Sequence, residues 1–107
     1  MIVTVFRSRL MPGLKDEYVK LLNRMVEVAT KTPGYIAHKG FTAEDGERCT
    51  IVEFESEEAQ RVFRMNPEHR EAQKKAREVY YETYSVQVCE VKREAKFDRN
   101  APPRAAE

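Results

Sequence analysis

The order of strand-type and helix-type segments constrains the fold of this chain more than any other feature. Strand-type segments, rich in β-branched and aromatic residues, cover residues 1–10, 35–43, 47–55 and 80–94. Helix-type segments, in which apolar residues recur every three or four positions, cover residues 14–31 and 56–79. The order β-α-β-β-α-β predicts an α+β, ferredoxin-like fold with one antiparallel sheet and the helices on one of its faces.

The last helical segment is predicted to form two helices with a break at Asn66 and Pro67. Ser56 offers a side-chain oxygen to the free N–H groups of the first helix, and Asn66 does the same for the second. Pro67 suits the first helical position, where its missing N–H is harmless. The second helix then runs to about Val79, with His69 in its first turn.

Apolar residues predict which side of each helix faces the sheet. The first helix carries one stripe, formed by Tyr18, Leu21, Leu22, Met25, Val28 and Ala29. In the two later helices the residues expected to face inward are Ala59, Val62 and Phe63, followed by Ala72, Ala76 and Val79. Breaker residues separate the other segments: Pro33 and Gly34 end the first helix, and Asp45 and Gly46 suit a tight hairpin.

The strands carry apolar residues in both phases of their alternation. Val3 and Val5 stand beside Ile2 and Phe6, and Ile51 stands beside Val52. Both faces of the sheet therefore need cover, whereas the helices supply it for only one. A sheet from a second copy would cover the other face, so the sequence predicts a homodimer packed sheet against sheet.

Charge and hydropathy narrow the range of partners. The chain has 19 basic and 18 acidic residues, a net charge of +1, and so lacks the basic excess that would neutralise phosphates. We expect no nucleic-acid partner, and we interpret the basic run at 73–77 as a solvated helix face. Neither a membrane-spanning apolar run nor a leader is recognised, which predicts a cytoplasmic protein without membrane attachment.

Two cysteines and the C-terminus complete the organisation. Cys49 and Cys89 lie in strand-type segments and are interpreted as small buried hydrophobes rather than as a disulfide. Residues 98–107 show no periodicity and are predicted to form a disordered tail. A single domain is expected over residues 1–97.

The two histidines are the main candidates for chemistry. A helix N-terminus lowers the proton affinity of a histidine, which would make His69 a neutral base near pH 7; the alternative is an exposed or cap-supporting side chain. His38, in phase with Ile36 and Gly40, would be a base or hydrogen-bond partner in a pocket, or else would pack at the dimer face. The pair lacks supporting acidic or cysteine residues at ligand spacing, so no metal site is predicted.

Tyrosines gather where the last helix passes into the last strand. Tyr80, Tyr81 and Tyr84 would stack on and hydrogen-bond to a flat phenolic ligand, or would fasten the helix to the sheet. Glu53 would be a carboxylate beside the pocket, or a charge that is solvated or paired across strands.

Three stretches resemble a known family: "PGYIAHKGF", "EDGERCTIVEFES" and "EEAQRVF" followed by "NPEH". They are similar to the antibiotic biosynthesis monooxygenase domain of the dimeric α/β barrel type, over residues 1–97. The resemblance implies a dimer with a pocket in each protomer, between sheet and helices. It also implies oxidation of aromatic polyketides or quinols by oxygen, often without metal or flavin, so no cofactor is expected.

The resemblance also bears on individual positions. Relatives that degrade haem use asparagine, tryptophan and histidine where this chain has Phe6, Phe63 and Gln73, which disfavours haem degradation here. Relatives that oxidise polyketides place polar and aromatic groups at the positions held here by Thr50, Phe54 and Gln60.

Two hypotheses about function follow. The first is a cofactor-independent oxygenase acting on a small aromatic or quinol-type compound, with His69 or His38 as base. The substrate-binding residues would then be Phe6, Phe54, Phe63, Gln73, Tyr81 and Tyr84. The second is a non-catalytic dimer that binds a small apolar ligand or serves as an accessory module.

Overall fold

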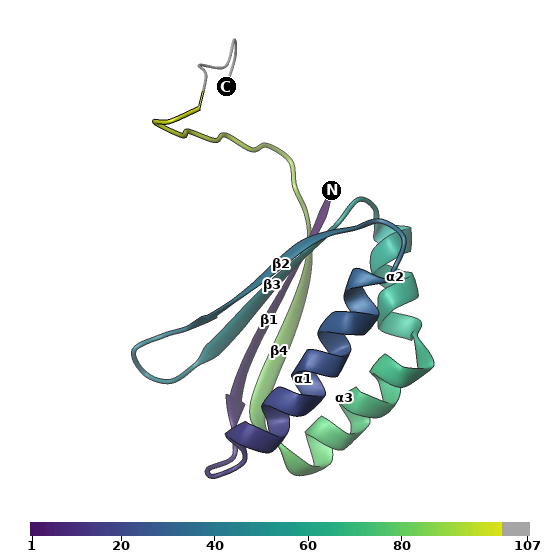
Figure 1. Cartoon of the computed structure of the whole chain (residues 1–107), viewed down its shortest axis with the longest axis vertical. Helices are drawn as coiled ribbons and strands as arrows, with labels where there is room; N and C mark the ends of the chain where they lie inside the picture. The colour runs from purple at the N-terminus through teal and green to yellow at the C-terminus, as the bar shows by residue number, and fades with distance from the viewer. Residues whose placement is uncertain (102–107) are drawn as a thin grey trace.

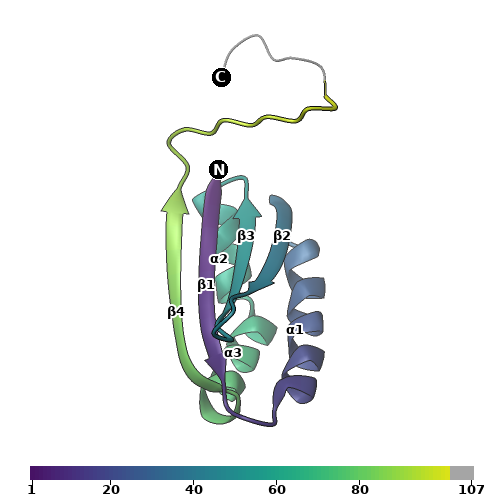
Figure 2. The same ribbon diagram turned by 90° about the vertical axis from the view of Figure 1, so that its left-hand side faces the viewer.

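A computed structural model describes residues 1–101 and confirms the predicted fold class. Its elements are β1 (Ile2–Leu10), α1 (Lys15–Thr30), β2 (Tyr35–Thr42), β3 (Arg48–Phe54), α2 (Glu57–Met65), α3 (Pro67–Val79) and β4 (Tyr81–Glu90) (Figure 1). The four strands form one antiparallel sheet in the order β2-β3-β1-β4. The helices of the described residues lie together on one face of this sheet (Figures 1 and 2).

The last strand is shorter than predicted. It ends at Glu90, which pairs with Ile2 at the start of β1, rather than near residue 94. The last hydrogen bond to this strand runs from the Val91 N–H to the Met1 carbonyl, at 3.1 Å. Residues 91–101 contain no helix or strand and lead away from the sheet (Figure 2). Of the predicted tail at 98–107, residues 102–107 lie outside the described part, and the domain boundary at 97 stays a prediction.

Strand register decides which side chains face the helices. Phe6 pairs with Thr50 on β3 and Val86 on β4, and these residues line the space under the helices. Neighbouring positions point the other way because side chains alternate along a strand. We call this helix-free side of the sheet the open face; its apolar and sulfur-bearing residues are Val3, Val5, Ala37, Phe41, Cys49, Ile51 and Cys89. The interpretation of Cys89 as buried is wrong for the single chain, since the open face leaves it exposed.

Two aromatic clusters hold the helices to the ends of the sheet. At one end, Phe54 is completely buried, with its ring 5.6 Å from that of Phe63. At the other end, Tyr18 of α1 packs against Tyr80 and Tyr81, with ring centroids 5.9 and 5.5 Å away. The sheet and helices are therefore in close contact at both ends, and the space between the clusters is left for a cavity.

The break between α2 and α3 is built as the sequence predicts. The Ser56 hydroxyl accepts from the Ala59 N–H at 3.1 Å and caps α2. The Asn66 side-chain oxygen accepts from the N–H groups of Glu68 and His69, at 2.8 and 3.2 Å, and caps α3. These bonds satisfy backbone donors that the first helical turn leaves free, and they fix the position of His69.

The inward side of these helices differs in part from the prediction. Val62 and Val79 are 47% and 41% exposed, whereas Gln60 is only 5% exposed. The helix α2 turns Ala59, Gln60 and Phe63 toward the sheet, and Val62 falls outside this sector. Along residues 1–101, the helices are all too short or too polar to cross a membrane.

Candidate functional site

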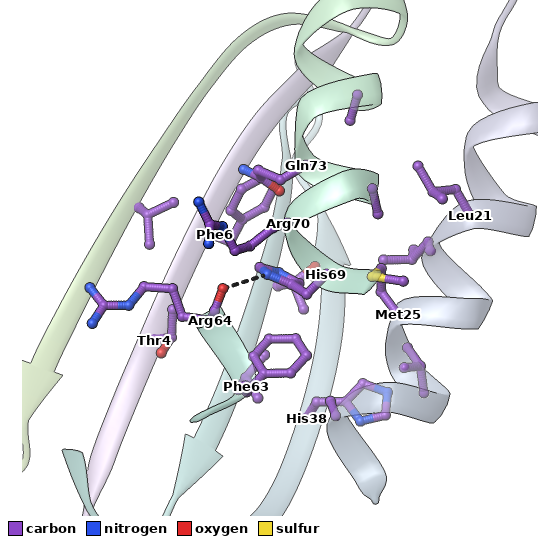
Figure 3. Close-up of a pocket in the computed structure, with 18 of the residues that line it drawn as sticks. Thr4, Phe6, Leu21, Met25, His38, Phe63, Arg64, His69, Arg70 and Gln73 are labelled. Atoms are coloured by element: carbon purple, nitrogen blue, oxygen red, sulfur yellow. Dashed lines mark hydrogen bonds between the residues drawn. The ribbon is translucent and has the colours of Figure 1, made fainter. Parts of the chain in front are cut away.

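A cavity of about 670 Å³ lies between the sheet and the helices (Figure 3). Its floor consists of helix-facing strand residues, including Thr4, Phe6, Thr50, Val52, Val86 and Val88. Its roof comes from the helices and includes Leu21, Met25, Phe63, His69, Ala72 and Gln73. The volume and the mostly apolar walls are typical of a site for a small organic molecule.

This cavity brings together the predicted site residues, with one exception. Residues that line it are His38, His69, Phe6, Phe54, Phe63, Gln73 and Tyr81. Tyr84 is not part of the lining; its ring stands edge-on to Phe6 at 5.7 Å and lies 5.3 Å from Tyr81. Tyr84 therefore contacts two lining rings without lining the cavity itself.

The junction of α2 and α3 fixes the imidazole of His69. The His69 ring packs on Phe63, with centroids 4.4 Å apart, and Nδ1 lies 3.3 Å from the Arg64 carbonyl oxygen. A carbonyl only accepts, so Nδ1 carries the proton of this bond and Nε2 keeps its lone pair. Burial lowers the pKa of His69 below its ordinary value of 6.5, against an opposing effect of the Arg64 carbonyl. The side chain is therefore a neutral imidazole at pH 7, with one nitrogen able to accept a proton.

His38 enters the cavity from the opposite side. It lies on β2, opposite Val52 of β3, and its ring faces the helices rather than the open face. Figure 3 shows it near α1, across the cavity from Arg64. Its Nδ1 is 2.6 Å from the Tyr35 hydroxyl, which fixes the ring at the edge of the sheet. Of the two positions considered for this histidine, the structure favours the cavity over the open face.

Two phenols meet at the far end of the cavity. The hydroxyls of Tyr18 and Tyr81 are 3.0 Å apart, and both side chains line the cavity. Burial raises the pKa of Tyr18 and of Tyr81, and in Tyr81 the neighbouring Tyr18 adds to the effect. Both groups therefore stay protonated at neutral pH; one hydroxyl hydrogen forms the bond between them, and the other remains for a further acceptor. Tyr80 instead belongs to the buried cluster that joins α3 to α1.

Sequence patterns missed several residues of the lining, notably Thr4, Arg64, Arg70 and Arg77. The interpretation of 73–77 as a solvated face holds for Lys74, Lys75 and Arg77, which are exposed, although Arg77 also borders the cavity. It is wrong for Gln73 and Ala76, which are half-buried and buried and line the cavity. Residues 70, 73 and 77 are three and four positions apart, which places them on one side of a helix. This spacing is the pattern from which their shared position at the cavity could have been predicted.

The sequence of this chain is similar to those of a known protein family. Residues 1–75 match the sequence profile of the family described as "Antibiotic biosynthesis monooxygenase". The chain belongs to this family. It is 34% identical over 83 residues to the uncharacterized protein YqjZ of Bacillus subtilis, a match that covers 78% of this chain and 73% of YqjZ.

Solved structures of similar fold agree with this membership. The cofactor-independent oxygenase SnoaB of Streptomyces nogalater superposes with a TM-score of 0.75 at 16% identity, covering 87% of this chain and 94% of SnoaB. Rv0793 of Mycobacterium tuberculosis superposes with a TM-score of 0.78 at 19% identity, covering 89% of this chain and 98% of Rv0793. At such identities the likeness concerns the fold alone.

The positions compared with the family's enzymes all face the cavity. Thr50, Phe54 and Gln60 line it, as do Phe6 and Phe63. Glu53, in contrast, is absent from the lining and lies on the open face, opposite the apolar residues Val3 and Ala37. It forms no ion pair within residues 1–101, so the structure supports neither a carboxylate beside the pocket nor a charge paired across strands. In residues 1–101, no group of three or more His, Cys, Asp or Glu residues is placed to hold a metal ion; the expectation of a metal-free site stays a prediction.

Proposed function

We propose that this member of the antibiotic biosynthesis monooxygenase family is a cofactor-independent oxygenase that oxidises a small aromatic or quinol-type substrate. The observation that carries the proposal is the neutral imidazole of His69, with Nε2 free to accept a proton at the wall of an apolar cavity. Aromatic rings on both sides of the cavity, among them Phe6 and Phe63, suit a flat ring between them.

The chemistry requires a base and an electron-rich substrate held in a mostly apolar cavity. His69 takes a proton from a phenolic or activated C–H group of the substrate, and the resulting anion gives an electron to oxygen. Recombination forms a carbon–oxygen bond, and loss of water leaves a carbonyl group. One oxygen atom enters the product, the other leaves as water, and the substrate supplies the electrons. Of the Tyr18 and Tyr81 hydroxyls, the one that accepts in their mutual bond keeps its hydrogen, which we expect to donate to a substrate oxygen as negative charge develops there.

Oxygen uptake by the metal-free protein tests this proposal directly. Against a panel of hydroquinones and anthrone-type phenols, we expect uptake that saturates with substrate and one atom of ¹⁸O from labelled oxygen in the product. Absence of uptake across the panel, with ligand binding retained, would contradict the oxygenase and support the alternative of a non-catalytic binding module.

We also propose that a second copy covers the open face. Val3, Val5 and Ile51 lie side by side there in register, with Val5 directly opposite Ile51. A contiguous apolar sheet face on a small domain favours association, and a two-fold pair covers it with one repeated contact. Sedimentation equilibrium should give twice the mass of one chain, and Val5→Lys should reduce it to that of one chain. A wild-type protein that sediments as a single chain at high micromolar concentration would refute the dimer.

A further inference from the structure

Charged residues are distributed unevenly around the cavity. Its lining contains Arg64, Arg70 and Arg77, whereas no aspartate or glutamate of residues 1–101 takes part in it. The imbalance is local, because the whole chain has 18 acidic residues against 19 basic ones. Of the other arginines in residues 1–101, four are paired with carboxylates and three are not; the paired ones are Arg7, Arg9, Arg24 and Arg61. The three arginines of the lining form no ion pair within residues 1–101.

Two of these arginines reach the same side of the cavity. Figure 3 shows Arg64 of α2 and Arg70 of α3 extending toward the side of β1 and β4, away from His38. Arg77 follows two turns after Arg70 on the same side of α3, about 10 Å further along the helix axis. Positive charge is therefore concentrated along one side of a space whose remaining walls are mostly apolar and carry no carboxylate.

A second polar group on this side lacks a partner. The Thr4 hydroxyl is buried, and it has no hydrogen-bond partner within the described part of the chain. Thr4 lies on β1 in the cavity lining, and Figure 3 places it beside Arg64. A buried hydroxyl without a partner is costly, so a ligand that accepts or donates a hydrogen bond here gains affinity.

We propose that the ligand of this cavity is an aromatic compound bearing a carboxylate, which Arg64 and Arg70 bind on the side of β1 and β4. A guanidinium group presents a planar pair of N–H donors that matches the two oxygens of a carboxylate. The Thr4 hydroxyl donates to the same acidic group, and the ring lies over Phe6 beneath His69 and Phe63. As a statement about the substrate, this inference rests on the proposed oxygenase function; as a statement about binding, it does not.

Calorimetric titration with two probes of equal size tests the inference. 2-Naphthoate carries a carboxylate at pH 7, and 2-naphthamide is its neutral counterpart. We expect the wild-type protein to bind the carboxylate about ten-fold more tightly than the amide, the effect of one charge-assisted contact. The preference should decrease in Arg64→Gln and in Arg70→Gln and disappear in the double variant, while affinity for the amide stays unchanged.

Arg61 provides a matched control on the same helix. It lies three residues before Arg64, pairs with Glu58 and does not line the cavity. Arg61→Gln removes the same net charge and should keep the wild-type preference. An equal loss of preference in Arg61→Gln, equal binding of both probes, or failure to bind the carboxylate at millimolar concentration would overturn the inference.

Failure of this inference is distinguishable from failure of the oxygenase proposal. The titration requires no turnover, so a charge preference without oxygen uptake would leave the carboxylate site standing and refute the oxygenase. Oxygen uptake with neutral hydroquinones but no charge preference would support the oxygenase and refute the carboxylate site. Circular dichroism of each variant shows that it is folded, which the exposure of both arginine side chains leads us to expect.

Discussion

Replacing His69 with glutamine is expected to lower kcat/KM for oxygen uptake by a factor of about 10² to 10⁴, the usual contribution of a positioned base. Glutamine keeps a hydrogen-bond donor for the Arg64 carbonyl and much of the contact with Phe63, but it cannot take up a proton at neutral pH. Uptake rates of the two proteins with the same substrate measure the effect. Activity of the variant within a factor of about ten of the wild type would remove His69 from the role of base.

The pH dependence provides an independent measurement. Burial lowers the pKa of His69, so wild-type kcat/KM should be constant near pH 7 and fall only below the ordinary value of 6.5. Stability should follow the same direction: the unfolded chain binds a proton at His69 at a higher pH than the folded chain does. The stabilising contribution of neutral His69 is thus complete above pH 6.5 and is lost as the pH falls through the folded-state pKa. Urea unfolding of the wild type and His69→Gln at several pH values isolates this effect.

Gly34→Ala is expected to destabilise the protein by about 2–5 kcal/mol, the sum of backbone strain and steric overlap. Gly34 lies in the turn before β2 with a φ of +92°, a backbone angle that residues with a Cβ rarely adopt. An added Cβ would lie 2.6 Å from the Ala59 Cβ at the start of α2. The overlap involves a buried residue of a short helix, so relief requires α2 to move away from the sheet. Urea unfolding at pH 7 measures the loss.

Gly46 is the matched control for this substitution. Its φ is +90°, nearly the same as that of Gly34, but a Cβ at this position in the hairpin meets nothing within 4 Å. Gly46→Ala should therefore cost only the backbone strain, about 1–2 kcal/mol. Equal losses at the two positions would mean that the close approach of Gly34 to Ala59 has no energetic role.

The features that sequence predicted well depend on local chemistry. Breaks and caps were correct because proline, glycine and short polar side chains favour particular backbone geometries whatever surrounds them. Ser56 and Asn66 cap their helices as expected. The long stripe on α1 was also correct, since many apolar positions over 16 residues determine which side faces the sheet.

The features that sequence missed depend on tertiary context. With nine residues, α2 offers too few apolar positions to fix its inward side, and Gln60 rather than Val62 is buried. Arg64 and Arg70 combine an apolar stem with a charged end, so they suit a solvated surface and a cavity wall equally well. The burial of Cys89 depends on whether the open face is covered by another molecule, and the sequence of one chain does not determine that.

The alternation of side chains along the strands has a consequence for how this protein can diverge. Thr4 and Phe6 face the cavity, whereas Val3 and Val5, between and beside them, belong to the open face. The proposed ligand contacts and the proposed contact with a second copy thus fall on interleaved but separate sets of positions on the same strands. Substitutions in one set leave the other chemically unchanged, so selection can alter what such a protein accepts while the contacts of its opposite face are conserved.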